Sequence, residues 1–193
     1  LAALRVLAAR PGPLPDYVFA ALADLPTRTA RQHTWRAAAA VLARAPTPEN
    51  SALLLSLLLA APDYDPLLTY AVRLALKQHL LGATGADFER LLASAAKSAT
   101  TTADLALAEI ALARGDGVHA EALARRALAA LTPELAETQT GALAQLTLAD
   151  VLARRDAGHD ERVRLADAAH ARLAAMFDAT HPLVDRAAAL RRP

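Results

Sequence analysis

The sequence has no cysteine and few residues that favour β-strands. The absence of cysteine excludes disulfides, thiolate metal sites, iron–sulfur clusters and cysteine nucleophiles. Eight valines, one isoleucine and seven aromatic residues among 193 leave little from which to build a sheet. An excess of one charge is also missing, because 21 basic residues face 20 acidic ones. The chain as a whole therefore carries no signature of polyanion binding.

Long apolar runs are missing as well. The longest uncharged apolar run, residues 51–61, is far shorter than the roughly 18–20 residues that a membrane-spanning helix needs. The first ten residues contain Arg5 and Arg10 and do not resemble a signal peptide. Because the chain begins with Leu1 rather than with methionine, we expect it to be a segment of a longer protein. We expect this segment to be cytoplasmic and, because its apolar runs are short, not to span a membrane.

Alanine and leucine dominate what is present, with 52 and 36 residues respectively. A hydrophobic fraction of 54% excludes intrinsic disorder. Proline after Thr47, Asp65, Thr132 and His181 is typical of a helix N-terminus. Thr84 with Asp87, and Thr101 with Asp104, have the spacing of capping boxes. These signals predict an all-α chain, at least about 70% helical against a globular average near a third, with about eleven helices near 1–10, 16–24, 28–45, 48–61, 66–81, 85–98, 102–114, 118–131, 133–155, 160–178 and 182–191.

Internal repetition indicates how these helices are organised. LARGD at 112–116 recurs as LARRD at 152–156, and VLAARPG at 6–12 has a fainter echo in VLARAPTP at 41–48. Offsets of 40 and 35 residues, built from helix pairs, are typical of an α-solenoid, in which stacked pairs close a shared core. We therefore predict antiparallel helix pairs in one continuous solenoid, with a first half at 1–100 and a second half at 101–193.

The second half, residues 102–191, resembles tetratricopeptide repeats. Gly115 stands where that family turns between helices, and Ala120 and Ala127 stand at its two small positions. The large aromatic positions of the family are not kept. The stretch AHARLAAMFDATHPLV, 169–184, resembles the kinesin-light-chain-like subtype, with Phe177 and His181 in register and Asp178 in place of its glycine. The resemblance implies a groove that binds a peptide or protein, and no catalysis.

The first half is less specific. Residues 28–98 resemble HEAT-type helix pairs, and the stretch 63–81 resembles helices of bacterial multidomain proteins that carry HEAT arrays beside enzymatic domains. The helix-pair prediction does not depend on this resemblance.

Isolated motifs do not converge on a reaction. Residues 115–120, GDGVHA, match a dinucleotide-binding pattern but follow a helical segment rather than a strand, which favours a helix–helix turn. His159, His170 and His181 are each eleven residues apart, too far to share an ion on one helix, and His181 is expected to order the loop before Pro182. No serine lies in a glycine-flanked turn, and Trp35 near Arg28, Arg31 and Arg36 fits a core position as well as a basic patch.

We therefore predict a non-catalytic helical-repeat scaffold for protein or peptide binding, with no cofactor, no metal and no nucleic-acid partner. Binding would use the concave face, lined by the first helix of each pair. The alternative is a regulatory or spacer region of a multidomain bacterial enzyme, such as a Ser/Thr kinase, whose catalytic domain lies outside this chain. The oligomeric state stays open. Polar residues expected on the binding face are Glu109, Gln145, Asp150, Arg73 and Lys77.

Overall fold

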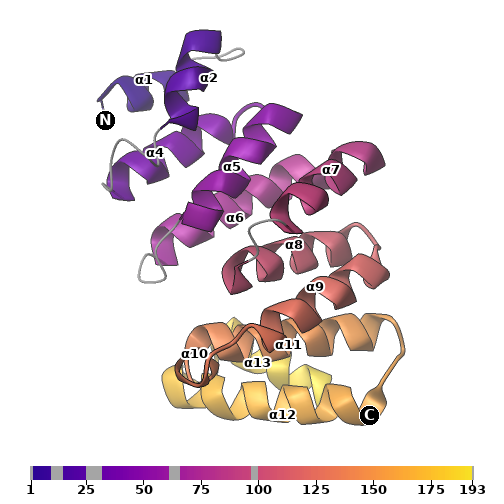
Figure 1. The fold of residues 1–193 in the computed structure, drawn as a ribbon. Helices are drawn as coiled ribbons and strands as arrows, with labels where there is room; N and C mark the ends of the chain where they lie inside the picture. Colours follow the sequence, from indigo (N-terminus) through magenta and orange to yellow (C-terminus); the bar gives the residue numbers. More distant parts are fainter. Residues whose placement is uncertain (1, 10–14, 25–31, 61–65, 97–99, 193) are drawn as a thin grey trace. The chain divides into compact units, whose positions relative to one another are not determined.

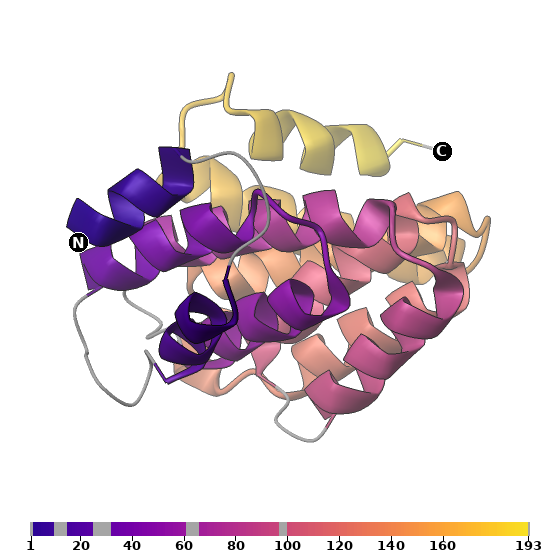
Figure 2. The same cartoon turned by 90° about the horizontal axis from the view of Figure 1, so that it is seen from above.

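The computed structural model describes the chain except residues 1, 10–14, 25–31, 61–65, 97–99 and 193. Of the residues it describes, 82% are helical and none is in a strand. Both views show helices joined by loops (Figure 1, Figure 2). The all-α prediction and the predicted helix content are confirmed. The chain divides into two compact units, residues 1–99 and residues 100–193.

Unit 1 is built from neighbouring helices that pack along the chain. In the described part they are α1 (Ala2–Ala9), α2 (Asp16–Ala23), α4 (Gln32–Leu42), α5 (Pro48–Ala60), α6 (Pro66–Leu81) and α7 (Gly85–Ala95). Helices α4, α5 and α6 pack against one another, α1 packs on α4, and α7 packs on α5 (Figure 1). Leucines fill the interior, and Trp35 is buried among them at 6% exposure. Trp35 therefore takes the core position, one of the two roles that the sequence left open.

In its described residues, unit 2 consists of two helix pairs, a short helix between the pairs, and one further helix after them. The elements are α8 (Thr101–Ala113), α9 (Gly117–Ala129), the short α10 (Pro133–Ala136), α11 (Gln139–Arg154), α12 (His159–Met176) and α13 (Pro182–Leu190). Helix α11 packs on both α8 and α9, and α13 packs on both α11 and α12, so each pair continues into the next. This succession is solenoid-like. Alanines line the contacts, which lets the helix axes approach closely. Those of unit 2 with no exposed surface are Ala103, Ala108, Ala111, Ala120, Ala124, Ala127, Ala142, Ala144, Ala149, Ala166, Ala169 and Ala187.

Most of the described helices begin as the local sequence predicts. The Thr47 hydroxyl accepts a hydrogen bond from the Asn50 amide at 3.1 Å, and the Thr132 hydroxyl accepts one from the Leu135 amide at 3.3 Å. Thr84 is the expected cap of α7, because the Asp87 amide donates to its hydroxyl, and that hydroxyl donates to the Asp87 carboxylate. His181 caps α13 through Nδ1.

Two local predictions were wrong. The cap of α8 is Thr100, which accepts from the Ala103 amide, so Asp104 is not a capping partner of Thr101. The predicted helix 133–155 is interrupted, since α10 ends at Ala136 and α11 begins at Gln139. A Cβ atom at Gly141 would lie 2.2 Å from the Ala136 carbonyl oxygen, so only glycine permits α10 to approach α11 this closely.

Two further observations complete the fold. No helix in the described ranges combines the length and the apolar character needed to cross a bilayer. The predicted cap at Asp65, and Arg28 and Arg31 of the basic patch considered above, lie outside the described residues.

Candidate functional site

The two helix pairs of unit 2 share the same turn. After α8, the Asp116 amide donates to the Ala111 carbonyl and Gly115 has a φ of +82°. After α11, the Ala157 amide donates to the Leu152 carbonyl and Asp156 has a φ of +50°. Both are helix ends closed by a residue in the left-handed region, for which glycine and, less often, aspartate are suited. The turn that ends the first helix of each pair therefore recurs.

The structural repeat differs slightly from the sequence repeat. LARGD and LARRD are 40 residues apart, but the left-handed residues Gly115 and Asp156 are 41 apart. Helix α11 runs one residue further because Asp156, rather than Arg155, takes the left-handed position. In this register Leu107 corresponds to Leu148, and Glu109 corresponds to Asp150.

Glu109 and Asp150 thus occupy the same place in α8 and α11. Glu109 is half-buried, and the Asp150 side chain is 14% exposed. Asp150 is ion-paired with Arg186 of α13, which links the first helix of one pair to the helix that follows the pair. A charge reversal at Asp150 would therefore also act on the packing of α13.

Gln145 also has a partner inside unit 2. Its carbonyl oxygen accepts a hydrogen bond from Arg172 of α12 at 2.9 Å. Arg172 also donates to Glu137 at 2.8 Å, which lowers the pKa of that carboxyl group. Gln145 therefore helps to hold α12 on α11. The remaining two predicted residues, Arg73 and Lys77, lie one turn apart on α6 of unit 1, with Arg73 half-buried and Lys77 exposed.

The stretch before α13 is ordered as the sequence predicts. The His181 ring stacks on the Phe177 ring with centroids 4.1 Å apart and planes 14° apart. The Nδ1 atom of His181 accepts a hydrogen bond from the Leu183 amide at 3.2 Å. Because Nδ1 is the acceptor, the ring proton of the neutral form lies on Nε2. His181 therefore acts here as a cap and a stacking partner.

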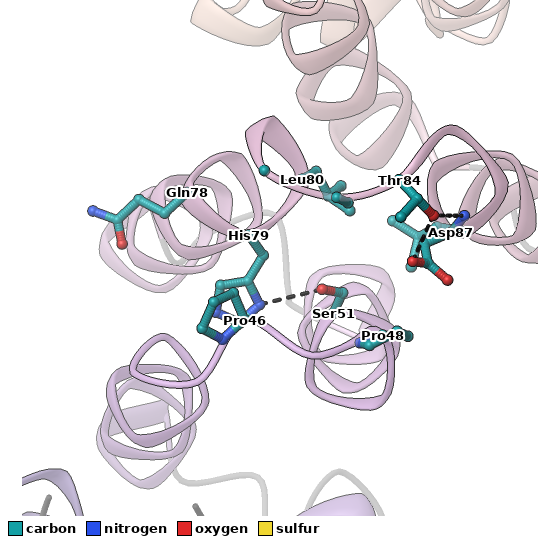
Figure 3. A pocket seen from close by; sticks show the side chains of 11 residues that line it. Pro46, Pro48, Ser51, Gln78, His79, Leu80, Thr84 and Asp87 are labelled. Atoms are coloured by element: carbon teal, nitrogen blue, oxygen red, sulfur yellow. Dashed lines mark hydrogen bonds between the residues drawn. The ribbon is translucent and has the colours of Figure 1, made fainter. Parts of the chain in front are cut away.

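Unit 1 contains a cavity of about 240 Å³ that is lined in part by Ser51 and His79. The sequence analysis did not bring these two polar residues together. Ser51 Oγ of α5 lies 3.2 Å from His79 Nδ1 of α6, and Figure 3 shows the two side chains facing one another beside Pro46. His79 Nε2 lies 3.2 Å from the Ala43 carbonyl oxygen at the end of α4. Asn50 Nδ2 donates to the Ala45 carbonyl at 2.7 Å. These buried polar groups connect α4, α5 and α6.

Hydrogen-bond geometry indicates what the Ser51–His79 pair can do. A neutral histidine that donates from Nε2 to Ala43 leaves Nδ1 free to accept the Ser51 hydroxyl proton. Ser51 Oγ also donates to the Thr47 carbonyl oxygen at 2.9 Å, so Thr47 and His79 Nδ1 compete for its single proton, and the residue is 4% exposed. A hydroxyl so enclosed is poorly placed to attack a substrate. The arrangement fits a buried clamp on three helices better than a nucleophile and its base.

No spacing in the sequence reveals this pair. Residues at equal distances from the turn of a helical hairpin lie at the same level. Ser51 lies nine residues before the last residue of α5, whereas His79 lies thirteen residues after the first residue of α6. Their distances from the turn differ by about one helical turn, so only the packing of α5 on α6 shows that the two side chains meet.

Acidification between pH 7 and pH 5 should destabilise the chain through His79. Burial lowers the pKa of His79 from its ordinary value of 6.5, against the opposing effect of the backbone carbonyls of Ala43 and Leu42. As the pH falls through 6.5, the unfolded chain takes up a proton that the folded chain resists. The contribution of His79 is therefore present above that value and lost below it. The slope of melting temperature against pH should be shallower in His79→Gln.

The control for this experiment is Leu54→Ala, a buried change that does not titrate. It should lower the melting temperature at every pH while keeping the wild-type slope. A His79→Gln chain with the wild-type slope would contradict the assignment.

Comparisons of the chain with models of protein families, with curated proteins and with solved structures gave no significant match.

Proposed function

We propose that this chain is a helical-repeat scaffold that binds a protein or peptide partner and carries no catalytic centre of its own. We assign its second half to repeats of the tetratricopeptide kind, similar to the kinesin-light-chain-like subtype. The observation that supports this most is the equivalence of α8 and α11 at 41 residues. At this spacing, α8 and α11 end in the same left-handed turn, and each carries an acidic residue at the same position.

The second helices support the same proposal at a spacing of 42 residues. Leu123, Ala124 and Ala127 of α9 correspond to Leu165, Ala166 and Ala169 of α12, and every one of these residues is buried. Repeats of this kind place their first helices along one side of the stack, where a partner can contact several of them. The stacked His181 and Phe177 fit the position at which the next first helix begins.

The proposal is tested by reversing one charge on a first helix. Glu109→Lys should reduce capture of the proteins that the wild-type chain retains by about three- to tenfold, because opposite charge at a binding surface favours the encounter. Its melting temperature should stay within a few degrees of the wild type. Capture is measured by pull-down with quantitative mass spectrometry. Asp150→Lys would change the packing of α13 together with the charge, since it breaks the pair with Arg186.

The matched control is Asp178→Lys, an identical charge change at an exposed residue between α12 and α13. It should leave capture unchanged. Equal capture by the wild type and Glu109→Lys would show that the first helices of unit 2 do not form the binding surface.

A further inference from the structure

Helix α6 exposes large apolar side chains along one side. Leu67 and Tyr70 are 61% and 67% exposed, and Leu74 and Leu81 are 44% and 47% exposed. The opposite side of the same helix is buried against α4 and α5, through Leu68, Val72, Leu76 and Leu80. A helix that needed only to complete unit 1 would carry polar residues on its outer side. The outer side of α6 thus requires a separate explanation.

The exposed residues follow a seven-residue repeat. Leu67, Tyr70, Leu74, Lys77 and Leu81 are spaced by three, four, three and four residues, and all of them are exposed. At about 100° per residue they fall within an arc of about 80°. The spacing is that of the a and d positions through which two helices interlock their side chains. We call these five residues the α6 seam, which extends over about 21 Å of helix at 1.5 Å per residue.

The positive charge on α6 restricts which kind of molecule can cover the α6 seam. Lys77 lies inside the α6 seam, and in the described part of the chain its side chain has neither a hydrogen bond nor an ion pair. Residues 66–81 contain Arg73, Lys77 and His79 and no acidic residue. A second copy of this helix would bring two Lys77 side chains to one interface, where like charges repel. An acidic residue opposite Lys77 would instead pair with it.

We infer that the α6 seam docks an amphipathic helix of a partner protein, with leucine-like residues at its a and d positions and a glutamate or aspartate opposite Lys77. This inference rests on the proposed scaffold function and names the chemical class of partner for the α6 surface of unit 1. A lipid surface fits less well, because basic residues at a membrane flank the apolar stripe, whereas Lys77 lies within it. The partner helix needs about two heptads to match the length of the α6 seam.

The test is selection from a displayed library of 18-residue helical peptides. Each peptide has leucine at every a and d position except one, and that one position is randomised. Which core position is randomised differs from one peptide to the next. The wild-type chain should enrich glutamate and aspartate over lysine at the randomised position by at least about fivefold. Lys77→Glu should reverse this preference. Leu67→Gln with Leu74→Gln, two exposed changes that should leave the fold intact, should abolish the enrichment.

The control Val118→Gln removes an equally exposed apolar residue from α9, outside the α6 seam, and should leave the enrichment unchanged. Enrichment that is insensitive to Lys77→Glu and to Leu67→Gln with Leu74→Gln, but is lost in Glu109→Lys, would overturn this inference and leave the proposed scaffold function standing. A library without any enrichment would count against both.

Separate measurements test two other occupants of the α6 seam, a second copy of this chain and a lipid surface. In analytical ultracentrifugation, the wild-type chain should not form a dimer that dissociates in Lys77→Glu or in the double variant Leu67→Gln with Leu74→Gln. It should not bind vesicles of phosphatidylcholine with 30% phosphatidylserine through the α6 seam. Either result would assign the α6 seam to a second copy or to a lipid surface and overturn the inference.

Discussion

Replacing Leu148 with alanine should lower the free energy of unfolding by about 2–4 kcal/mol, the range for a fully buried leucine. The Leu148 side chain has no exposed surface and lies in α11, which packs on α8, α9 and α12. Helices α8, α9 and α11 are rich in buried alanine, whose side chains have no rotamers with which to fill the space that is lost. Leu107→Ala, at the equivalent position in α8, should cost a similar amount, since Leu107 is equally buried.

Urea unfolding followed by circular dichroism measures this effect, and hydrogen exchange assigns the loss to unit 2. Val118→Ala is the control, because Val118 is 67% exposed and its truncation should change stability by less than about 0.5 kcal/mol. A cost below about 1 kcal/mol at both leucines would show that the alanine-rich core rearranges to fill the cavity.

Arg126→Met should destabilise unit 2 by about 2–4 kcal/mol, because it leaves a buried carboxylate without its partner. The side chain of Asp104 is 1% exposed, and both of its oxygens accept from Arg126, at 2.7 and 2.5 Å. The pair joins α9 to α8. The pKa of the Arg126 guanidinium is raised, chiefly by its hydrogen bond to Asp104.

Two further variants test whether the loss of stability in Arg126→Met comes from the Asp104–Arg126 pair. Arg125→Met makes the same change one residue earlier, where the arginine contacts Glu121 and Glu161 at the surface, and should cost less than about 1 kcal/mol. The double variant Asp104→Ala with Arg126→Met should be more stable than Arg126→Met alone, since it removes the unpaired charge. A double variant that is less stable than the single one would disprove this account.

Local chemistry explains how much of the fold could be predicted from the sequence. A cap depends on a side chain and an amide two or three residues away, so Thr47, Thr84 and Thr132 could be identified without knowledge of packing. Composition excluded a sheet for the same reason, because helix propensity acts residue by residue. The stacked arrangement of Phe177 and His181 was also within reach, since four residues separate them.

The candidate site required contacts between distant segments. Ser51 and His79 are 28 residues apart, and Asp104 and Arg126 are 22 apart. Their sequence signals were ambiguous, because a serine near a helix start and an aspartate near a cap have common local roles. The α6 seam was equally hidden, since a helix that is apolar on both sides does not reveal which side its neighbours cover.

The sequence by itself determined that this chain is helical and where most of its helices begin. Only the tertiary structure decided that Asp104 is buried against Arg126, that Gly141 receives the backbone of Ala136, and that Leu67, Tyr70 and Leu74 are left exposed. The physical reason is the range of the interactions. Caps and propensities act within one or two helical turns, whereas the rotation of each helix about its axis is set by the burial of side chains from all its neighbours at once.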